Sequence, residues 1–424
     1  LDMAALLLRN DADGTVDEGE IRATDAQRSP SVVKTTVSYI NKVLGTELSR
    51  AEMEKIFYQL GFTVAGPEDE LVVTVPNRRW DISIPADLVE EVGRIYGYDN
   101  LKSTQPLLAE THGGYSAKET AMRIIKDIVQ GQGLMEAISY SLTSPEKAIS
   151  FTKDPKPVVE VQWPLNSSRS TMRENLITGL VDAASYNMAR KQKELALFEQ
   201  GRVYDHENNT FNEHEHLATL YSGHTLAANW QHLDQKIDFY FVKGQLTNLF
   251  RAIGIKDEDV EYRAELVQGM HPTRTAGIYI NDQYVGLIGM LAHAVTTLDK
   301  ALRGSEIYVY EIDLDAIVSM LHKGMKAKAA PKFPAIERDL SLLVPNDVTN
   351  AQIEAQIKLN GGKYLYDIRV IDVYAGSQIE SGHKSISYSL TFLNEKDTLT
   401  DEVVATAMEK IEADLKESLK IKVR

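Results

Sequence analysis

Cysteine is absent from this chain of 424 residues. Without cysteine there can be no disulfide and no thiolate metal site, which fits a reducing compartment. Long apolar runs are also missing: no stretch reaches the length of a membrane span, and no signal-peptide pattern opens the sequence. Hydrophobic residues make up 43% and charged residues 25%, as in ordinary globular proteins. We therefore predict a globular, cytoplasmic protein without membrane contact.

Positive charge is in short supply, because the formal net charge is -15 at pH 7. Indiscriminate nucleic-acid binding requires a net basic surface, so this balance argues against it. Any contact with RNA must come from local patches and from stacking. The sequence also lacks a phosphate-binding loop of the G-x-x-x-x-G-K type.

The chain is long enough for roughly two to four domains with sizeable cores. We expect an α+β multidomain protein, and because the sequence opens at Leu1 within an expected helix end, we expect a truncated chain. The expected boundaries are 1–30 (remnant of an upstream domain and linker), 31–105, 106–323, 324–331 (linker) and 332–424.

Residues 31–105 are expected to form two helices, a hairpin and a third helix, which is a winged-helix-like order. Ser49 and Glu52 have the spacing of a capping box at the start of the second helix. A winged helix raises DNA binding as a rival function. The expected recognition helix carries Glu54 and Glu52 against Arg50 and Lys55, a poor charge balance for a major-groove reader. We therefore expect no DNA partner.

The most distinctive stretch, 75–99, reads VPNRRWDISIPADLVEEVGRIYGYD. A helix is expected from about Pro85 to Gly97, with one apolar face and one acidic face. The acids can form a solvated helix face paired with Arg94, or a site for a hard cation such as Mg²⁺, which takes oxygen ligands. Spacing alone favours the solvated face.

The run P-N-R-R-x-D-I-x-x-x-x-D-L-x-E-E-x-x-R-I-Y-G-Y-D in this stretch resembles bacterial phenylalanyl-tRNA synthetase β subunits. The family's metal-binding acids correspond in position and spacing to Asp81, Asp87, Glu90 and Glu91. The resemblance implies that these four carboxylates hold Mg²⁺ near the α subunit. Family members are longer than this chain, so the resemblance covers their C-terminal half.

Residues 106–323 are expected to alternate helices (116–129, 176–191, 242–252) and strands (138–142, 195–204, 218–222, 277–280, 284–288, 306–312). Strands outnumber the crossover helices that a parallel sheet needs, so an antiparallel sheet is expected. The segments 172–176, 187–190, 197–201, 243–244, 271–272 and 286–289 resemble the family's catalytic-like module, which has a class II synthetase-like fold. Residues 286–291 contain no arginine where class II synthetases hold ATP, so we expect no catalytic residue in this chain.

Residues 332–424 follow the order β-α-β-β-α-β of a ferredoxin-like fold. The segments 333–334, 338–339, 372–376, 384–385 and 398–402 resemble the family's anticodon-binding domain. This resemblance implies tRNA contacts from Arg338, Asp372, Tyr374, Lys384 and Ser385. Residues 331–424 hold 12 basic and 15 acidic residues, so stacking and shape must carry recognition. Tyr374 could instead simply pack on the sheet.

Taken together, the resemblance implies a non-catalytic β subunit of phenylalanine–tRNA ligase. Its partners would be the α subunit, in an α₂β₂ heterotetramer, and tRNA(Phe), with ATP used by the α subunit. The family's editing pocket lies upstream, so no hydrolytic editing is expected here. The alternative is a nucleic-acid-binding scaffold protein, built from a winged helix and a ferredoxin-like domain, with no synthetase partner.

Overall fold

The computed structural model describes residues 1–23, 29–105, 112–226, 230–231, 234–320, 329–376 and 378–424. The chain divides into two compact units, Leu1–Gly113 and Gly114–Arg424. Within the described residues, every helix is too short or too polar to cross a bilayer. Residues 324–328 of the expected linker at 324–331 lie outside the described residues. The expected remnant at 1–30 contains helix α1 (Asp2–Asp11), none of whose residues is buried.

Residues 31–105 fold around a three-stranded antiparallel sheet in the order β1–β3–β2. Three helices complete a core that includes Ile40, Met53, Phe57, Val73 and Leu88. The expected helices and hairpin are all present. Their bounds are β1 (Ser31–Thr36), α2 (Val37–Leu44), α3 (Arg50–Gln59), β2 (Thr63–Ala65), β3 (Glu70–Val75) and α4 (Pro85–Tyr96), followed by a single 3₁₀ turn at Tyr98–Asn100.

The helix boundaries follow from local chemistry. The Thr36 side chain accepts from the Tyr39 N–H at the start of α2, and Gly45 ends that helix with a left-handed φ of 69°. Ser49 and Glu52 form the expected capping box of α3: the Ser49 N–H donates to Glu52 Oε2 at 2.7 Å, and the Glu52 N–H donates to Ser49 Oγ.

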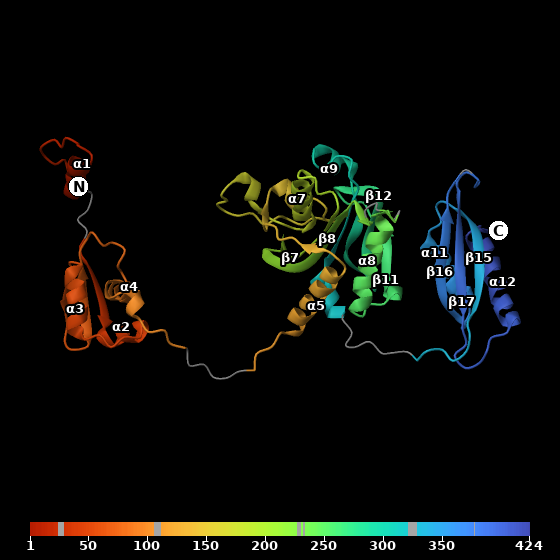
Figure 1. Cartoon of the computed structure of the whole chain (residues 1–424), viewed down its shortest axis with the longest axis horizontal. Coiled ribbons are helices and arrows are strands. Elements are labelled where there is room, and N and C mark those ends of the chain that lie inside the picture. Colours follow the sequence, from red (N-terminus) through yellow and green to blue (C-terminus); the bar gives the residue numbers. More distant parts are fainter. Residues whose placement is uncertain (24–28, 106–111, 227–229, 232–233, 321–328, 377) are drawn as a thin grey trace. The chain divides into compact units, whose positions relative to one another are not determined.

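Residues 114–320 are organised by a seven-stranded sheet in the order β11–β12–β13–β14–β8–β7–β4 (Figure 1). Every pairing is antiparallel except β4 with β7, which confirms the expected antiparallel sheet. The strands of this sheet are β4 (Met135–Glu136), β7 (Leu195–Glu207), β8 (Thr210–Ser222), β11 (Val260–Ala264), β12 (Met270–Ile280), β13 (Gln283–Leu291) and β14 (Ile307–Asp313). The helices are α5 (Ala117–Gly131), α6 (Pro145–Ala148), α7 (Ile177–Met188), α8 (Phe239–Ala252), α9 (His293–Leu298) and α10 (Leu314–Met320). Two small ribbons pair β5 (Leu142–Thr143) with β6 (Thr171–Met172) and β9 (His224–Leu226) with β10 (Gln235–Lys236).

Both faces of the seven-stranded sheet are buried. Helices α5, α8 and α10 contribute to one core, which includes Ile125, Leu246 and Ile317. Helix α7 contributes to a second core, which includes Leu180 and Ala184. Neighbouring strand residues alternate between these two cores, as the two-residue period of a strand requires.

The expected strand at 138–142 is wrong. The structure has only the short strands β4 and β5 on either side, and Ile138 is 88% exposed. The Ala137 N–H still donates to the Phe198 carbonyl at 2.7 Å, but the next bonds go to a side chain. The Ser139 N–H and Oγ donate to the Glu199 carboxylate at 3.2 and 2.7 Å, and these bonds replace the backbone ladder.

A buried carboxylate joins the layers of this unit. Glu311, on β14, accepts from the backbone N–H groups of Leu176 and Ile177, with its Oε2 at 3.0 and 3.2 Å. Its Oε1 lies 2.7 Å from Nδ1 of His216 on β8. The N–H groups at the start of a helix have no partner within the helix, so Glu311 both caps α7 and attaches it to the sheet.

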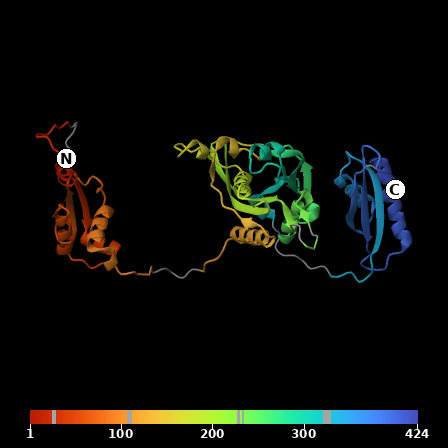
Figure 2. The same ribbon diagram turned by 45° about the horizontal axis from the view of Figure 1, so that its top comes forward.

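Residues 331–424 adopt the expected β-α-β-β-α-β order. The four-stranded antiparallel sheet has the order β16–β17–β15–β18, and the core includes residues of α11 and α12. The dark blue helix α12 runs along the blue strands in both views (Figures 1 and 2). The bounds are β15 (Ile336–Pro345), α11 (Asn350–Asn360), β16 (Leu365–Tyr374), β17 (His383–Phe392), α12 (Asp401–Ser418) and β18 (Lys422–Val423).

The close pairing of β13 and β14 yields a prediction. A Cβ added at Gly286 would lie 2.0 Å from the backbone oxygen of Glu311, which cannot move without breaking the ladder. We expect Gly286→Ala to lower the free energy of unfolding by about 1–3 kcal/mol or more. Chemical denaturation followed by circular dichroism measures this loss.

Gly244 offers a matched control, because it lies inside helix α8 and a Cβ there would meet nothing within 4 Å. Gly244→Ala should be stabilising by about 0.5–1 kcal/mol, as alanine is the better helix former. Equal effects of the two substitutions would contradict the close approach at Gly286.

Candidate functional site

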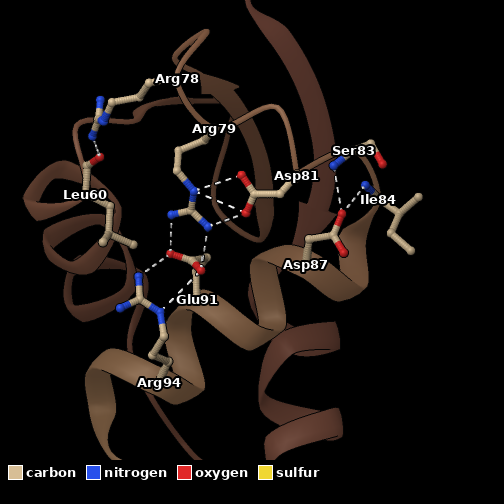
Figure 3. A network of polar contacts seen from close by, with 9 residues as sticks. All are labelled: Leu60, Arg78, Arg79, Asp81, Ser83, Ile84, Asp87, Glu91 and Arg94. Carbon is tan, nitrogen blue, oxygen red and sulfur yellow. Dashed lines mark hydrogen bonds and ion pairs between the residues drawn. The ribbon is translucent and has the colours of Figure 1, made fainter. Parts of the chain in front are cut away.

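Helix α4 begins at a proline and is capped by an acid from its own first turn. Pro85 occupies a position where the missing N–H is not needed. Oδ2 of Asp87 accepts from the N–H groups of Ser83 and Ile84, at 2.7 and 2.9 Å (Figure 3). The Asp87 carboxylate is therefore engaged by the backbone of the loop that enters the helix.

Glu91 is the buried acid of this helix, with only 3% of the residue exposed. It accepts from both terminal nitrogens of Arg79, at 2.8 and 2.9 Å, and from Nη2 of Arg94 at 2.6 Å (Figure 3). The hydrogen bonds from Arg79 lower the pKa of Glu91 to about 2, against the opposing effect of burial. Glu91 thus stays ionised because two guanidinium groups surround it.

Arg79 connects this helix to the preceding loop. Besides Glu91, its guanidinium donates to Asp81, with Nη2 2.7 Å and Nε 3.1 Å from the carboxylate oxygens. The same bonds lower the pKa of Asp81, and bonds to Glu91 and Asp81 raise that of Arg79. One cation is therefore shared by two of the four predicted metal ligands.

The four acids predicted to hold Mg²⁺ do not form such a site as they lie here. Asp81 and Glu91 face Arg79, Asp87 faces backbone N–H groups, and Glu90 is exposed. Across the described part of the chain, no group of three or more His, Asp or Glu side chains is placed to hold a metal ion. A hard cation needs free oxygen ligands, and the carboxylates of Asp81, Asp87 and Glu91 already accept N–H donors. The resemblance-based magnesium site stays a prediction, and the present geometry does not fit it.

The second set of predicted site residues lies on the ferredoxin-like sheet. Directly opposed residues of an antiparallel pair lie on the same face, so the register assigns each side chain. Ile386 and Leu390 face the core under α11 and α12. Asp372 opposes Ser387 and Tyr374 opposes Ser385, which places them on the other face. We call this face, away from α11 and α12, the open face.

The structure therefore separates the five predicted tRNA contacts. Asp372, Tyr374 and Ser385 share the open face, although Ser385 itself is buried. Arg338 opposes Leu390 on the helix-covered face and pairs with Asp401. Lys384 opposes Val344 on that same face, and its Nζ donates to the Val348 carbonyl at 2.8 Å.

Tyr374 itself fills the space beside Gly376. A Cβ on Gly376 would lie 2.2 Å from the Tyr374 hydroxyl, so the glycine permits the ring to lie against it. The residue remains 40% exposed. By register, the open face carries four acids and two basic side chains: Glu337, Asp339, Asp367, Asp372, Arg369 and Lys422.

The ion pairs among Arg79, Asp81, Glu91 and Arg94, which we call the Arg79 network, generate a prediction about stability and pH. Arg79→Gln removes the paired donors from buried Glu91, which should lower the free energy of unfolding at neutral pH by about 1–3 kcal/mol. A lowered pKa stabilises the fold above its unfolded value of 4.5, and that contribution disappears as the pH falls towards about 2. The difference in stability between Arg79→Gln and the unsubstituted chain should therefore narrow as the pH falls from 4.5 to about 2. Thermal unfolding at a series of pH values measures this difference.

Arg78→Gln is the neighbouring control, because the Arg78 guanidinium donates to the Leu60 carbonyl and not to a carboxylate (Figure 3). Arg78→Gln should lower the free energy of unfolding less than Arg79→Gln does, and by an amount that does not change with pH over the same range. Mg²⁺ or EDTA should leave the unfolding curve of the unsubstituted chain in place, since guanidinium groups already neutralise Glu91. A shift with Mg²⁺ would instead support the metal site implied by the resemblance.

Family models match three successive parts of the chain. The tRNA synthetase B5 domain matches residues 33–98 and contains the Arg79 network. The phenylalanyl tRNA synthetase beta chain CLM domain matches residues 101–314, which is half of the chain. The ferredoxin-fold anticodon binding domain matches residues 331–424 and contains the open face.

Curated relatives match from end to end. A phenylalanine–tRNA ligase beta subunit of Lactobacillus johnsonii is 98% identical over 424 residues, which is 100% of this chain and 53% of that protein. Proteins of the same name from Lactobacillus acidophilus and Latilactobacillus sakei are 72% and 42% identical, with the same coverage. The chain spans about half the length of these relatives, 53%. It belongs to the phenylalanyl-tRNA synthetase β subunit family.

Proposed function

We propose that this chain serves in a phenylalanine–tRNA ligase, as the part of the β subunit that assembles with the α subunit and binds tRNA(Phe). The observation that carries this proposal is the succession of B5, CLM and anticodon-binding domains in one chain. The α subunit would use ATP to charge the tRNA, and this chain alone would be inactive. The scaffold-protein alternative is not favoured, because end-to-end relatives are named as ligase subunits.

Finer aspects of the fold belong to the same proposal. The β1–β3–β2 sheet with its helices supports a winged-helix-like B5 domain. The antiparallel sheet with one parallel edge pair, β4 and β7, supports a class II synthetase-like CLM domain. A cytoplasmic location, the α₂β₂ stoichiometry and the lack of editing by this part of the subunit stay predictions.

Association and activity test the proposal together. We expect the chain to co-purify with a phenylalanyl-tRNA synthetase α subunit when the two are expressed together, and to give no phenylalanine-dependent pyrophosphate exchange when purified alone. Exchange by the chain alone would refute the assignment of catalysis to the α subunit. A failure to associate, with binding of unrelated nucleic acids, would favour the scaffold protein.

The open face supports recognition by stacking and not by charge. Its acids outnumber its basic side chains, so it would repel a phosphate backbone. A half-exposed tyrosine ring can stack on an unpaired base. Asp372 lies two residues earlier on the same face, where its carboxylate can accept from the Watson–Crick edge of a guanine.

We expect Tyr374→Ala to weaken binding of tRNA(Phe) by about 1–3 kcal/mol, the range measured for base–aromatic stacking. Asp372→Asn should reduce the preference for tRNA(Phe) over the same tRNA with a swapped anticodon. Fluorescence anisotropy at one fixed salt concentration measures both, because affinity for RNA depends on salt.

Tyr240→Ala is the control, since Tyr240 is an exposed tyrosine of helix α8, outside the anticodon-binding domain. It should bind both tRNAs as the unsubstituted chain does. Equal weakening of both tRNAs by Tyr374→Ala would remove the support for anticodon reading while leaving the fold intact.

A further inference from the structure

The CLM domain contains a cavity of about 300 Å³ that the proposed function does not use. This volume lies at the lower end of the range for small-molecule sites. The cavity is bounded by the segment 151–156 and by strands β7, β8, β13 and β14. Its lining includes apolar side chains from three of these parts, namely Phe151, Val203, Leu287 and the ring of Tyr284.

The charged lining of the cavity is predominantly acidic. Five carboxylates line it, from Asp154, Glu174, Asp205, Glu311 and Asp313. Two lysines also line it. Both pair with carboxylates outside the lining, and Nζ of Lys156 also lies 3.5 Å from Asp205, one of the five lining acids. Nζ of Lys153 lies 2.7 Å from Glu265, and Nζ of Lys156 lies 2.8 Å from Glu207. The cavity therefore favours a cation over an anion.

Glu174 is the acid whose hydrogen bonding is incomplete. The residue is 9% exposed, and its Oε1 accepts from the Lys156 N–H at 2.7 Å. Its Oε2 is buried and has no hydrogen-bond partner among the described residues. Burial raises the pKa of Glu174, and the nearby Asp205 raises it further. Most buried polar atoms have a partner, so this oxygen lacks a donor that a ligand can supply.

We propose that this cavity binds a small organic ammonium ion, whose N–H donates to Glu174 Oε2 and whose apolar body packs against Phe151, Val203 and Leu287. The ammonium supplies both the missing donor and a positive charge to a lining in which carboxylates outnumber lysines by five to two. A charge-assisted hydrogen bond of this kind is stronger than one between neutral groups. The proposal does not rest on tRNA binding or on assembly with the α subunit.

Isothermal titration calorimetry on the 424-residue chain tests the proposal with benzylamine, benzyl alcohol and benzoate. These probes share a ring of similar size but differ in charge. We expect binding of benzylamine at millimolar concentration, weaker binding of benzyl alcohol and none of benzoate. Glu174→Gln keeps an acceptor for the Lys156 N–H but removes the charge, and should weaken benzylamine binding about tenfold or more.

Glu213→Gln is the matched control, because Glu213 is an exposed acid on β8 that pairs with Arg202 and does not line the cavity. It should leave benzylamine binding unchanged. The proposal is overturned if benzoate binds as well as benzylamine, if benzylamine does not bind, or if Glu174→Gln binds it with unchanged affinity. Should Glu174→Gln fail to fold, the comparison of the three probes on the unsubstituted chain still decides.

Discussion

The carboxylate of Glu311 attaches helix α7 to the seven-stranded sheet of residues 114–320. It accepts from two backbone N–H groups at the start of α7 and from His216 on β8, while its own strand β14 lies in the middle of the sheet. Burying a carboxylate costs free energy unless donors compensate for the lost water. Glu91 in the B5 domain obeys the same constraint with two arginines, so in both units a buried acid attaches a helix to another part of the fold.

Much of the fold could be predicted because its signals are local. The capping box at Ser49, the helix from Pro85 and the order of helices and strands along the C-terminal domain all follow from local sequence patterns. The strand expected at 138–142 failed because its local sequence does not determine which groups its backbone pairs with. Its outcome depended on Glu199, sixty residues away, whose carboxylate takes the bonds that a neighbouring strand would have taken.

The candidate sites were predictable in part, for similar reasons. Asp372 and Tyr374 lie two residues apart, so strand alternation places them on one face, in agreement with the register. Since Lys384 and Ser385 are adjacent in a strand, alternation alone implies that they point to opposite faces. The position of Arg338 depends on its pairing with β17, which no local pattern reveals. Arg79 was present in the family motif, but its role as the partner of Glu91 requires the folded loop.

The burial of both faces of the seven-stranded sheet has a consequence for strand alignment. In β14, Ile307 and Val309 enter one core while Tyr308 and Tyr310 enter the other, so either face is apolar. A slip of this strand by one residue would exchange the two faces without exposing a hydrophobic side chain to water, and hydrophobicity alone would oppose it weakly. The same slip would move the Glu311 carboxylate to the opposite face, away from the N–H groups of α7. The buried Glu311 carboxylate, and not hydrophobicity, thus selects the register of β14 in this sheet.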